Sequence, residues 1–140
     1  MEIISHHEQD TIAAAQTFAR TLTAGDVVAF YGDLGAGKSV FCRAIIRTLS
    51  GIPDLNVPSP TFSLVQTYET PACEIWHFDF YRLEHPEELY ELGWEEALSG
   101  HIVLIEWPER IPHALPAQTQ RVTIEDLSET TRRIIIEGII

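Results

Sequence analysis

The chain contains few basic residues. Nine lysines and arginines stand against twenty-one acids, the formal net charge is −12, and Lys38 is the single lysine. Non-specific nucleic-acid binding needs a basic face that displaces counterions from phosphate groups, so this charge argues against it. If the protein serves a nucleic-acid pathway, we expect another subunit to hold the polymer.

Cysteine is also scarce, and long apolar runs are missing. The two cysteines, Cys42 and Cys73, follow no metal-ligand spacing, and a reduced, core-packed thiol is the simpler account of Cys42. No charged-then-apolar leader opens the chain, and no apolar run approaches membrane-spanning length. These absences favour a reduced, cytoplasmic location without membrane contact. The length predicts one domain over residues 1–140.

What the chain does have is a glycine-rich motif at residues 32–39, Gly-Asp-Leu-Gly-Ala-Gly-Lys-Ser. It fits the phosphate-loop pattern of Gly, four residues and Gly-Lys-Ser/Thr without a mismatch. A short β-branched and aromatic run at 26–31 predicts a buried strand before it, and residues 40–49 place apolar side chains at helical spacing after it. An ordinary glycine-rich turn would not need these neighbours, so the context favours a nucleotide site.

Each part of this loop has an expected role. Gly35 and Gly37 let the backbone approach a ligand, so that N–H groups form an anion nest at the positive end of the helix dipole. Lys38 is expected to reach the β- and γ-phosphates, and the Ser39 hydroxyl to ligate Mg²⁺. The expected cofactors are therefore ATP or ADP and Mg²⁺. The nucleotide-binding residues predicted from the loop are Asp33, Leu34, Gly35, Ala36, Gly37, Lys38, Ser39 and Val40.

The remaining pattern predicts an α/β fold. Residues 1–5 suggest an edge strand, 8–22 an amphipathic helix, and 61–68 and 74–82 two antiparallel strands joined by a short connection. Residues 85–98 suggest a helix interrupted by Gly93, and 120–136 a terminal hairpin. We expect a P-loop NTPase-like three-layer sandwich, with a mixed central sheet, helices on both faces and a C-terminal antiparallel hairpin.

Two further positions point to chemistry in the middle of the chain. Residues 50–60 hold three prolines and a glycine, and a loop this long in a small domain is usually functional or mobile. Thr61 follows it and either senses the γ-phosphate and Mg²⁺ or is a plain strand-entry threonine. Asp79 lies among aromatic residues, so it must be near a strand end, paired or coordinating something.

The second most informative stretch is His-Ile-Val-Leu-Ile-Glu-Trp-Pro at 101–108. Four successive β-branched or leucine residues predict a strand buried on both faces, which ends in Glu106. Ligands of open α/β sheets bind at the carboxyl edge, so Glu106 should face Mg²⁺ and the γ-phosphate if this strand runs parallel to the one before the phosphate loop. Glu106 and Asp79 compete to bind metal and to orient water, and the sequence does not divide these two roles. Trp107 leaves an indole beside the site.

Four motifs together carry a family resemblance. The phosphate loop, Ser-Pro-Thr-Phe at 59–62, His-Phe-Asp-Phe-Tyr-Arg at 77–82 and Glu-Trp-Pro-Glu at 106–109 occur in that order. The combination resembles the bacterial TsaE family (formerly YjeE), the ATPase of tRNA threonylcarbamoyladenosine biosynthesis, over nearly the whole chain. That family often has threonine where this chain has Ser39, and either hydroxyl can bind Mg²⁺.

The resemblance implies ATP hydrolysis, weak when the protein is alone, in concert with the partners TsaB and TsaD. Those partners modify adenosine 37 of tRNAs that read codons beginning with A, so tRNA would be contacted only through them. The implied catalytic residues are Lys38, Thr61, Asp79 and Glu106, with Ser39, Asp79 and Glu106 at the metal and Trp107 near the adenine.

Two other functions remain open. One is a regulatory nucleotide-binding module that controls a partner without required hydrolysis. The other is a small-molecule kinase, which is disfavoured because the chain lacks an arginine-rich lid and an evident acceptor pocket. Guanine specificity is unsupported, because an Asn-Lys-x-Asp base-reading motif needs a lysine and the single one lies in the phosphate loop.

Overall fold

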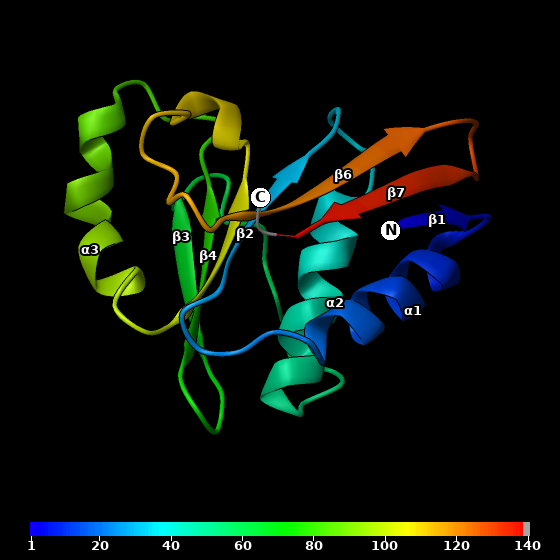
Figure 1. Ribbon diagram of the computed structural model, residues 1–140, viewed down its shortest axis with the longest axis horizontal. Helices are drawn as coiled ribbons and strands as arrows, with labels where there is room; N and C mark the ends of the chain where they lie inside the picture. The colour runs from blue at the N-terminus through cyan, green and yellow to red at the C-terminus, as the bar shows by residue number, and fades with distance from the viewer. Residues whose placement is uncertain (139–140) are drawn as a thin grey trace.

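The computed structural model describes residues 1–138, and its seven strands form one mixed sheet in the order β1-β7-β6-β2-β5-β4-β3 (Figure 1). The strands are β1 (Glu2–Ser5), β2 (Val27–Tyr31), β3 (Val65–Glu69), β4 (Glu74–Asp79), β5 (Ile102–Glu106), β6 (Gln120–Asp126) and β7 (Arg132–Glu137). The helices are α1 (Glu8–Ala19), α2 (Lys38–Ser50), the 3₁₀ segment η1 (Pro86–Leu92), α3 (Trp94–Ala97) and the 3₁₀ turn η2 (Pro108–Arg110).

The pairing of the strands confirms the predicted mixed sheet. Strands β4, β5, β2 and β6 run parallel to one another as neighbours, and β3 and β7 pair antiparallel with β4 and β6. The terminal hairpin β6–β7 is part of the main sheet, because β6 pairs with β2, and β1 closes that edge by pairing with β7. The carboxyl ends of β2, β4 and β5 therefore meet at one edge, where open α/β sheets bind ligands.

The two central strands are buried as their composition predicts. All five residues of β5 and the first four of β2 are buried. A strand covered on both faces has no position for a solvated side chain, which is why these segments are continuous apolar runs instead of alternating ones. Glu106 is the exception in β5, and it lies at the edge where the strand ends.

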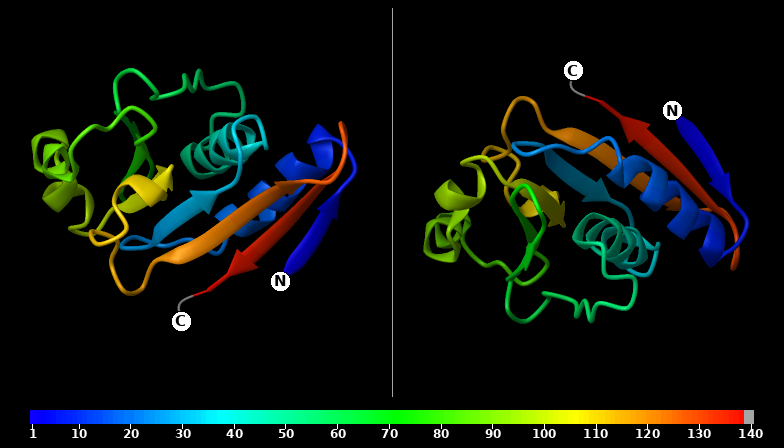
Figure 2. Two further views of the ribbon diagram at one scale, coloured as in Figure 1. Left: turned by 90° about the horizontal axis from the view of Figure 1, so that it is seen from above. Right: turned by 90° about the horizontal axis from the view of Figure 1, so that it is seen from below.

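Helices cover the two faces of the sheet unequally. Helices α1 and α2 pack on one face, and η1 and α3 lie on the other (Figure 2). The buried cluster under α1 and α2 takes side chains from β2, β4, β5, β6 and β7, whereas the one under η1 and α3 takes buried strand side chains from β2, β4 and β5 and packs against Val65 of β3. The sandwich thus has three layers around β2, β5 and β4 and two layers at the β6–β7–β1 edge.

Four elements differ from their predicted bounds or form. Strand β3 begins at Val65 instead of residue 61, and β4 ends at Asp79 instead of residue 82. Helix α1 ends at Ala19 instead of residue 22. The segment predicted as an interrupted helix at 85–98 is a 3₁₀ segment followed by the single α-turn of α3, because Gly93 between them adopts a left-handed conformation with φ +85°.

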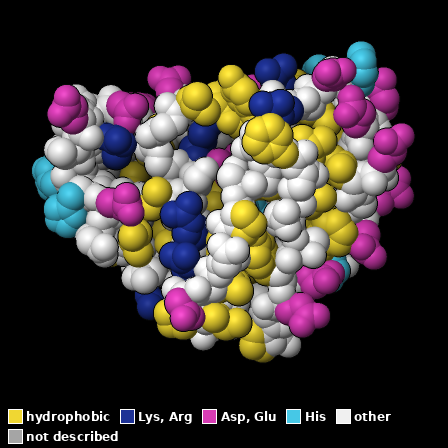
Figure 3. Space-filling view, turned by 180° about the vertical axis from the view of Figure 1, so that it is seen from behind, with side chains coloured by type: hydrophobic (Ala, Val, Ile, Leu, Met, Phe, Trp, Pro, Cys, Tyr) yellow, Lys and Arg dark blue, Asp and Glu magenta, His cyan; other side chains and the backbone are white. Residues whose placement is uncertain are grey.

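Within residues 1–138, no helix is both long and apolar enough to cross a bilayer. On the face in Figure 3, acidic side chains lie mostly around the margin.

Candidate functional site

The phosphate loop connects β2 to α2 and is shaped by its glycines. At Gly32, φ is +148°, and a Cβ atom there would lie 2.5 Å from the carbonyl oxygen of Ile124 in β6. At Gly37, φ is +110°, and this residue caps the N-terminus of α2. Only glycine fits the first position, because any side chain would collide with backbone. The first turn of α2 then leaves its N–H groups without partners inside the helix.

Lys38 is almost fully buried beneath this loop. Its Nζ donates a hydrogen bond of 2.6 Å to the Gly32 carbonyl oxygen and lies 3.5 Å from the centre of the Trp107 ring. Burial lowers the pKa of Lys38, and the negative charges of nearby acids, Glu106 first, oppose that shift. The ammonium group is thus held between a carbonyl, an aromatic face and carboxylates, where a phosphate could replace some of these contacts.

Trp107 reaches Lys38 because of its backbone conformation. It follows β5 and has φ +59° and ψ +50°, a left-handed conformation that is uncommon for any residue except glycine. Its ring also packs against Tyr81, with ring centres 4.9 Å apart. Non-glycine residues in this region are held there by their surroundings and gather at functional sites.

Glu106 is buried and hydrogen-bonded through both carboxylate oxygens. The Ser39 hydroxyl donates to Oε1 at 3.1 Å, and Nε2 of His77 lies 2.7 Å from Oε2. Only 2% of Glu106 is exposed. The parallel register of β2 and β5 brings Glu106 beside the phosphate loop, as the sequence predicted.

Asp79 lies beside Glu106, because the register of β4 and β5 pairs these two residues. The Thr61 hydroxyl donates to Asp79 Oδ2 at 3.0 Å, and the Tyr81 backbone N–H donates to Oδ1 at 2.9 Å. The predicted strand-end carboxylate and the predicted loop threonine are therefore direct partners. Thr61 is also hydrogen-bonded to Ser59, at 2.7 Å.

A cavity of about 290 Å³ joins these groups. It is lined by Leu34, Gly35, Gly37, Lys38, Ser39, Val40, Thr61, Asp79, Tyr81, Arg82, Glu106 and Trp107. Two of the predicted nucleotide-binding residues, Asp33 and Ala36, do not line it. Asp33 accepts a hydrogen bond from the Ala36 N–H within the loop, and Ala36 faces a different cavity.

That second cavity, of about 270 Å³, lies on the other side of the phosphate loop. It shares Gly35, Gly37 and Val40 with the first. Its remaining wall comes from Ala36 of the loop, the start of α1, the β6–β7 turn and the first residue of β7: His7, Glu8, Thr11, Glu129, Thr130 and Arg132.

Comparison with known proteins now identifies the family. The family model described as "Threonylcarbamoyl adenosine biosynthesis protein TsaE" matches residues 5–134. The chain belongs to the TsaE family. A TsaE protein of Rickettsia felis is 48% identical over 93% of this chain and 75% of its own length. One from Treponema pallidum is 33% identical over 97% of this chain and 99% of its own. The crystal structure of Bacillus subtilis YdiB has the same fold, with a TM-score of 0.79 at 24% identity, covering 99% of this chain and 85% of that one.

Four residues of this TsaE chain contact the site but were not predicted as site residues. Tyr81 lines the first cavity, and its backbone N–H donates to Asp79. His77 bonds to Glu106, Arg82 lines the first cavity, and Arg132 donates from Nε to the Ala36 carbonyl oxygen at 3.1 Å. The alternation along β4 places His77 on the face that it shares with Asp79, so that signal was present. Arg132 had no such signal, since 96 positions separate it from Ala36.

The oxygen atoms at the site suit a hard cation. Ser39 Oγ and Glu106 Oε1 are already in contact, and Asp79 is paired in register with Glu106. Hydroxyl and carboxylate oxygens are the ligands that Mg²⁺ prefers, together with water and substrate phosphates. The donor set of this TsaE chain therefore fits the ion that its phosphate loop implies.

Proposed function

We propose that this chain is the ATP-binding and ATP-hydrolysing subunit of tRNA threonylcarbamoyladenosine biosynthesis. Its place in that pathway follows from the family. The observation that carries the enzymatic part is the shared cavity, in which the phosphate-loop lysine, the Ser39–Glu106 contact and the Thr61–Asp79 contact meet. A structural glycine turn would not need two buried carboxylates at its mouth.

The geometry gives each group a role in phosphoryl transfer to water. Lys38 would move from the Gly32 carbonyl to phosphate oxygens, and the loop N–H groups would hold the same phosphates. Ser39, Glu106 and Asp79 would hold Mg²⁺, which when bound supplies positive charge to neutralise the phosphates. One of these two carboxylates, Glu106 or Asp79, would also accept a hydrogen bond from the attacking water and orient it.

TsaB and TsaD are the partners that we propose for this activity. The net charge of −12 supports a division of labour in which those partners, and not this chain, hold the tRNA. ATP hydrolysis by this chain would then act on the partner complex, and this chain would not contact the threonylcarbamoyl group that is transferred to the tRNA.

Steady-state ATP hydrolysis, with and without TsaB and TsaD, tests the proposal. We expect slow turnover alone and faster turnover with the partners. Lys38→Ala should lower the rate of ATP hydrolysis at least a hundredfold, because removing one preorganised donor to the transition-state charge costs about 10²- to 10³-fold in turnover. Arg121→Ala is a matched control, since Arg121 is a cation stacked on Tyr31 of β2, outside both cavities. If wild-type protein fails to turn over ATP in either condition, the enzymatic proposal is wrong.

A regulatory switch is the second candidate, and the Thr61–Asp79 hydrogen bond favours it. This bond ties a proline-rich loop to a carboxylate beside the phosphate site, so nucleotide binding could move the loop without hydrolysis. Under this alternative, Glu106→Ala still binds ATP and still supports threonylcarbamoylation by the partners. Loss of modification with retained ATP binding would instead support required hydrolysis.

The position of the adenine can be tested separately. We expect it near Trp107, but that indole lies against the Lys38 ammonium, and the second cavity offers another place for the base. If Trp107 stacks on adenine, Trp107→Ala should weaken ADP about tenfold and leave pyrophosphate binding unchanged. If the base lies in the second cavity, Thr11→Trp should block ADP binding. Trp107→Ala should then change the affinities for ADP and pyrophosphate equally.

A further inference from the structure

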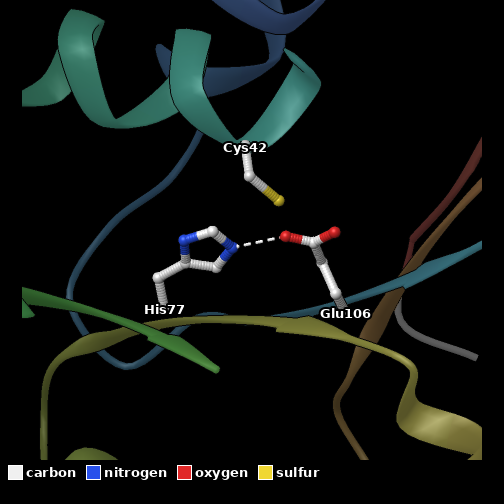
Figure 4. A group of neighbouring side chains, drawn as sticks. All are labelled: Cys42, His77 and Glu106. Atoms are coloured by element: carbon white, nitrogen blue, oxygen red, sulfur yellow. Dashed lines mark hydrogen bonds and ion pairs between the residues drawn. The ribbon is translucent and has the colours of Figure 1, made fainter. Parts of the chain in front are cut away.

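A buried histidine lies behind the phosphate site and bonds to its main carboxylate. His77 is in the middle of β4, Glu106 ends β5, and the two side chains are 2% and 3% exposed. Figure 4 shows the two side chains on neighbouring strands, both directed toward α2. Their Nε2–Oε2 distance of 2.7 Å is that of a strong hydrogen bond between a ring nitrogen and a carboxylate.

The surroundings determine which way this bond runs. A carboxylate oxygen only accepts, so the proton must lie on Nε2 of His77. The other ring nitrogen, Nδ1, is buried and has no hydrogen-bond partner among residues 1–138. A second proton on Nδ1 would bury an N–H group without an acceptor, which is costly. A ring that carries its donor proton on Nε2 therefore fits this position.

This bond limits where Glu106 can point. With Oε2 bonded to His77, Oε1 faces the Ser39 hydroxyl at 3.1 Å. The competing partner is Lys38: burial lowers the pKa of its ammonium group, and among the nearby acids Glu106 opposes that shift most strongly. The two form no ion pair within the described residues, although a freed carboxylate would gain by turning toward the ammonium. His77 thus keeps Glu106 at Ser39 and leaves Lys38 for phosphate.

We propose that His77 is a positioning residue of the nucleotide site: its Nε2–H bond holds the Glu106 carboxylate at Ser39 and so sets the Mg²⁺ concentration that nucleotide binding requires. This inference rests on the proposed function, which assigns Ser39 and Glu106 to Mg²⁺. Partners that orient a metal-binding carboxylate commonly contribute ten- to a hundredfold to metal affinity.

Cys42 supplies a matched control within the same cluster. Its thiol faces His77 and Glu106 from α2, and the three potential ligand atoms lie within 4.8 Å of one another (Figure 4). Burial raises the pKa of the Cys42 thiol well above its ordinary value, so the group is uncharged. Both Glu106 oxygens and His77 Nε2 already have hydrogen-bond partners, so these three atoms do not need a metal between them. Cys42→Ala alters its packing without removing the donor.

The test is the Mg²⁺ concentration that gives half-maximal binding of a fluorescent ADP analogue. His77→Gln can place an amide N–H near the position of Nε2, whereas the amide of His77→Asn is too short to reach Glu106. We expect His77→Asn to raise the required Mg²⁺ about tenfold, His77→Gln to stay within about threefold of wild type, and Cys42→Ala to stay within about twofold. Thermal melts without nucleotide report whether each variant folds.

Three results would overturn this role: wild-type Mg²⁺ dependence in His77→Asn, equal defects in the Asn and Gln variants, or failure of both to fold. Ring nitrogen chemical shifts of His77 in nucleotide-free wild-type protein provide an independent readout. They should report the neutral tautomer protonated at Nε2, and protonation at Nδ1 alone would refute the inference. If wild type shows no Mg²⁺-dependent nucleotide binding, the proposed function fails, while the tautomer still decides whether His77 holds Glu106.

Discussion

The two carboxylates of the site lie side by side but are held in different ways. Asp79 and Glu106 pair in register, and both are buried. The partners of Glu106, Ser39 and His77, belong to regular elements, α2 and β4. Asp79 depends on a threonine from the loop between α2 and β3, with only a backbone N–H as its second donor. One half of the site is therefore built into the core, and the other is completed by a loop.

This difference predicts where the site moves. Separating the backbone segments that carry Ser39 and Glu106 requires α2 to shift against the sheet, where Phe41 and Ile45 are fully buried. Breaking the Thr61–Asp79 contact requires only that the loop swing away, and its next residue, Phe62, is 81% exposed. Segments with few buried contacts open at low free energy, so we expect ligand-dependent rearrangement in the Thr61 half.

Exchanging each carboxylate for its amide should give the largest effects and rank the two halves. Glu106→Gln should lower ATP hydrolysis about a thousandfold, because it loses the negative charge and its single amide oxygen cannot accept from both His77 and Ser39. Asp79→Asn should have at least a tenfold smaller effect. Steady-state hydrolysis with TsaB and TsaD at saturating ATP measures both. A larger defect in Asp79→Asn would reverse the ranking of the two halves.

The rigidity of the core half can be tested at Gly32. Gly32→Ala places a Cβ atom 2.5 Å from the Ile124 carbonyl oxygen, in addition to the cost of a positive φ. We expect it to lower the free energy of unfolding by about 3 kcal/mol. Gly51→Ala is the matched control, since φ there is +74° and no atom lies within 4 Å of the added carbon. It should cost about 1 kcal/mol. Urea denaturation measures the free energy of unfolding of both variants. Equal losses would mean that β6 can move away from the added methyl group.

Local patterns allowed much of the core half to be predicted. The apolar runs of β2 and β5 indicated buried parallel strands, and the strand, loop and helix order placed Lys38 and Ser39. Residue alternation put His77 and Asp79 on one face. Alternation gives the face of a residue but not the register between strands, so the bond from His77 to Glu106 could not be predicted.

The contacts that sequence reasoning missed join distant segments. Arg132 reaches the phosphate loop because the β6–β7 hairpin joins the sheet beside β2, a pairing that no local pattern specifies. The same is true of Arg82, whose guanidinium stacks on Phe62 at 4.3 Å because the loop folds back over β4. Local chemistry thus indicated which groups act, and the sheet topology decided which of them meet.

Removing the Thr61 hydroxyl should produce the smallest effect and sharpen the contrast between the two halves. In Thr61→Ala, Asp79 loses one donor but keeps the Tyr81 N–H, so we expect about a fivefold loss of ATP hydrolysis and an unchanged melting temperature. Thr61→Ser keeps the hydroxyl and should stay within about twofold of wild type. Amide hydrogen exchange in Thr61→Ala should accelerate at residues 59–64 and not in β4 or β5, because only the loop loses its attachment. Faster exchange in both strands would mean that the loop helps to hold the core, and that the two carboxylates belong to one unit after all.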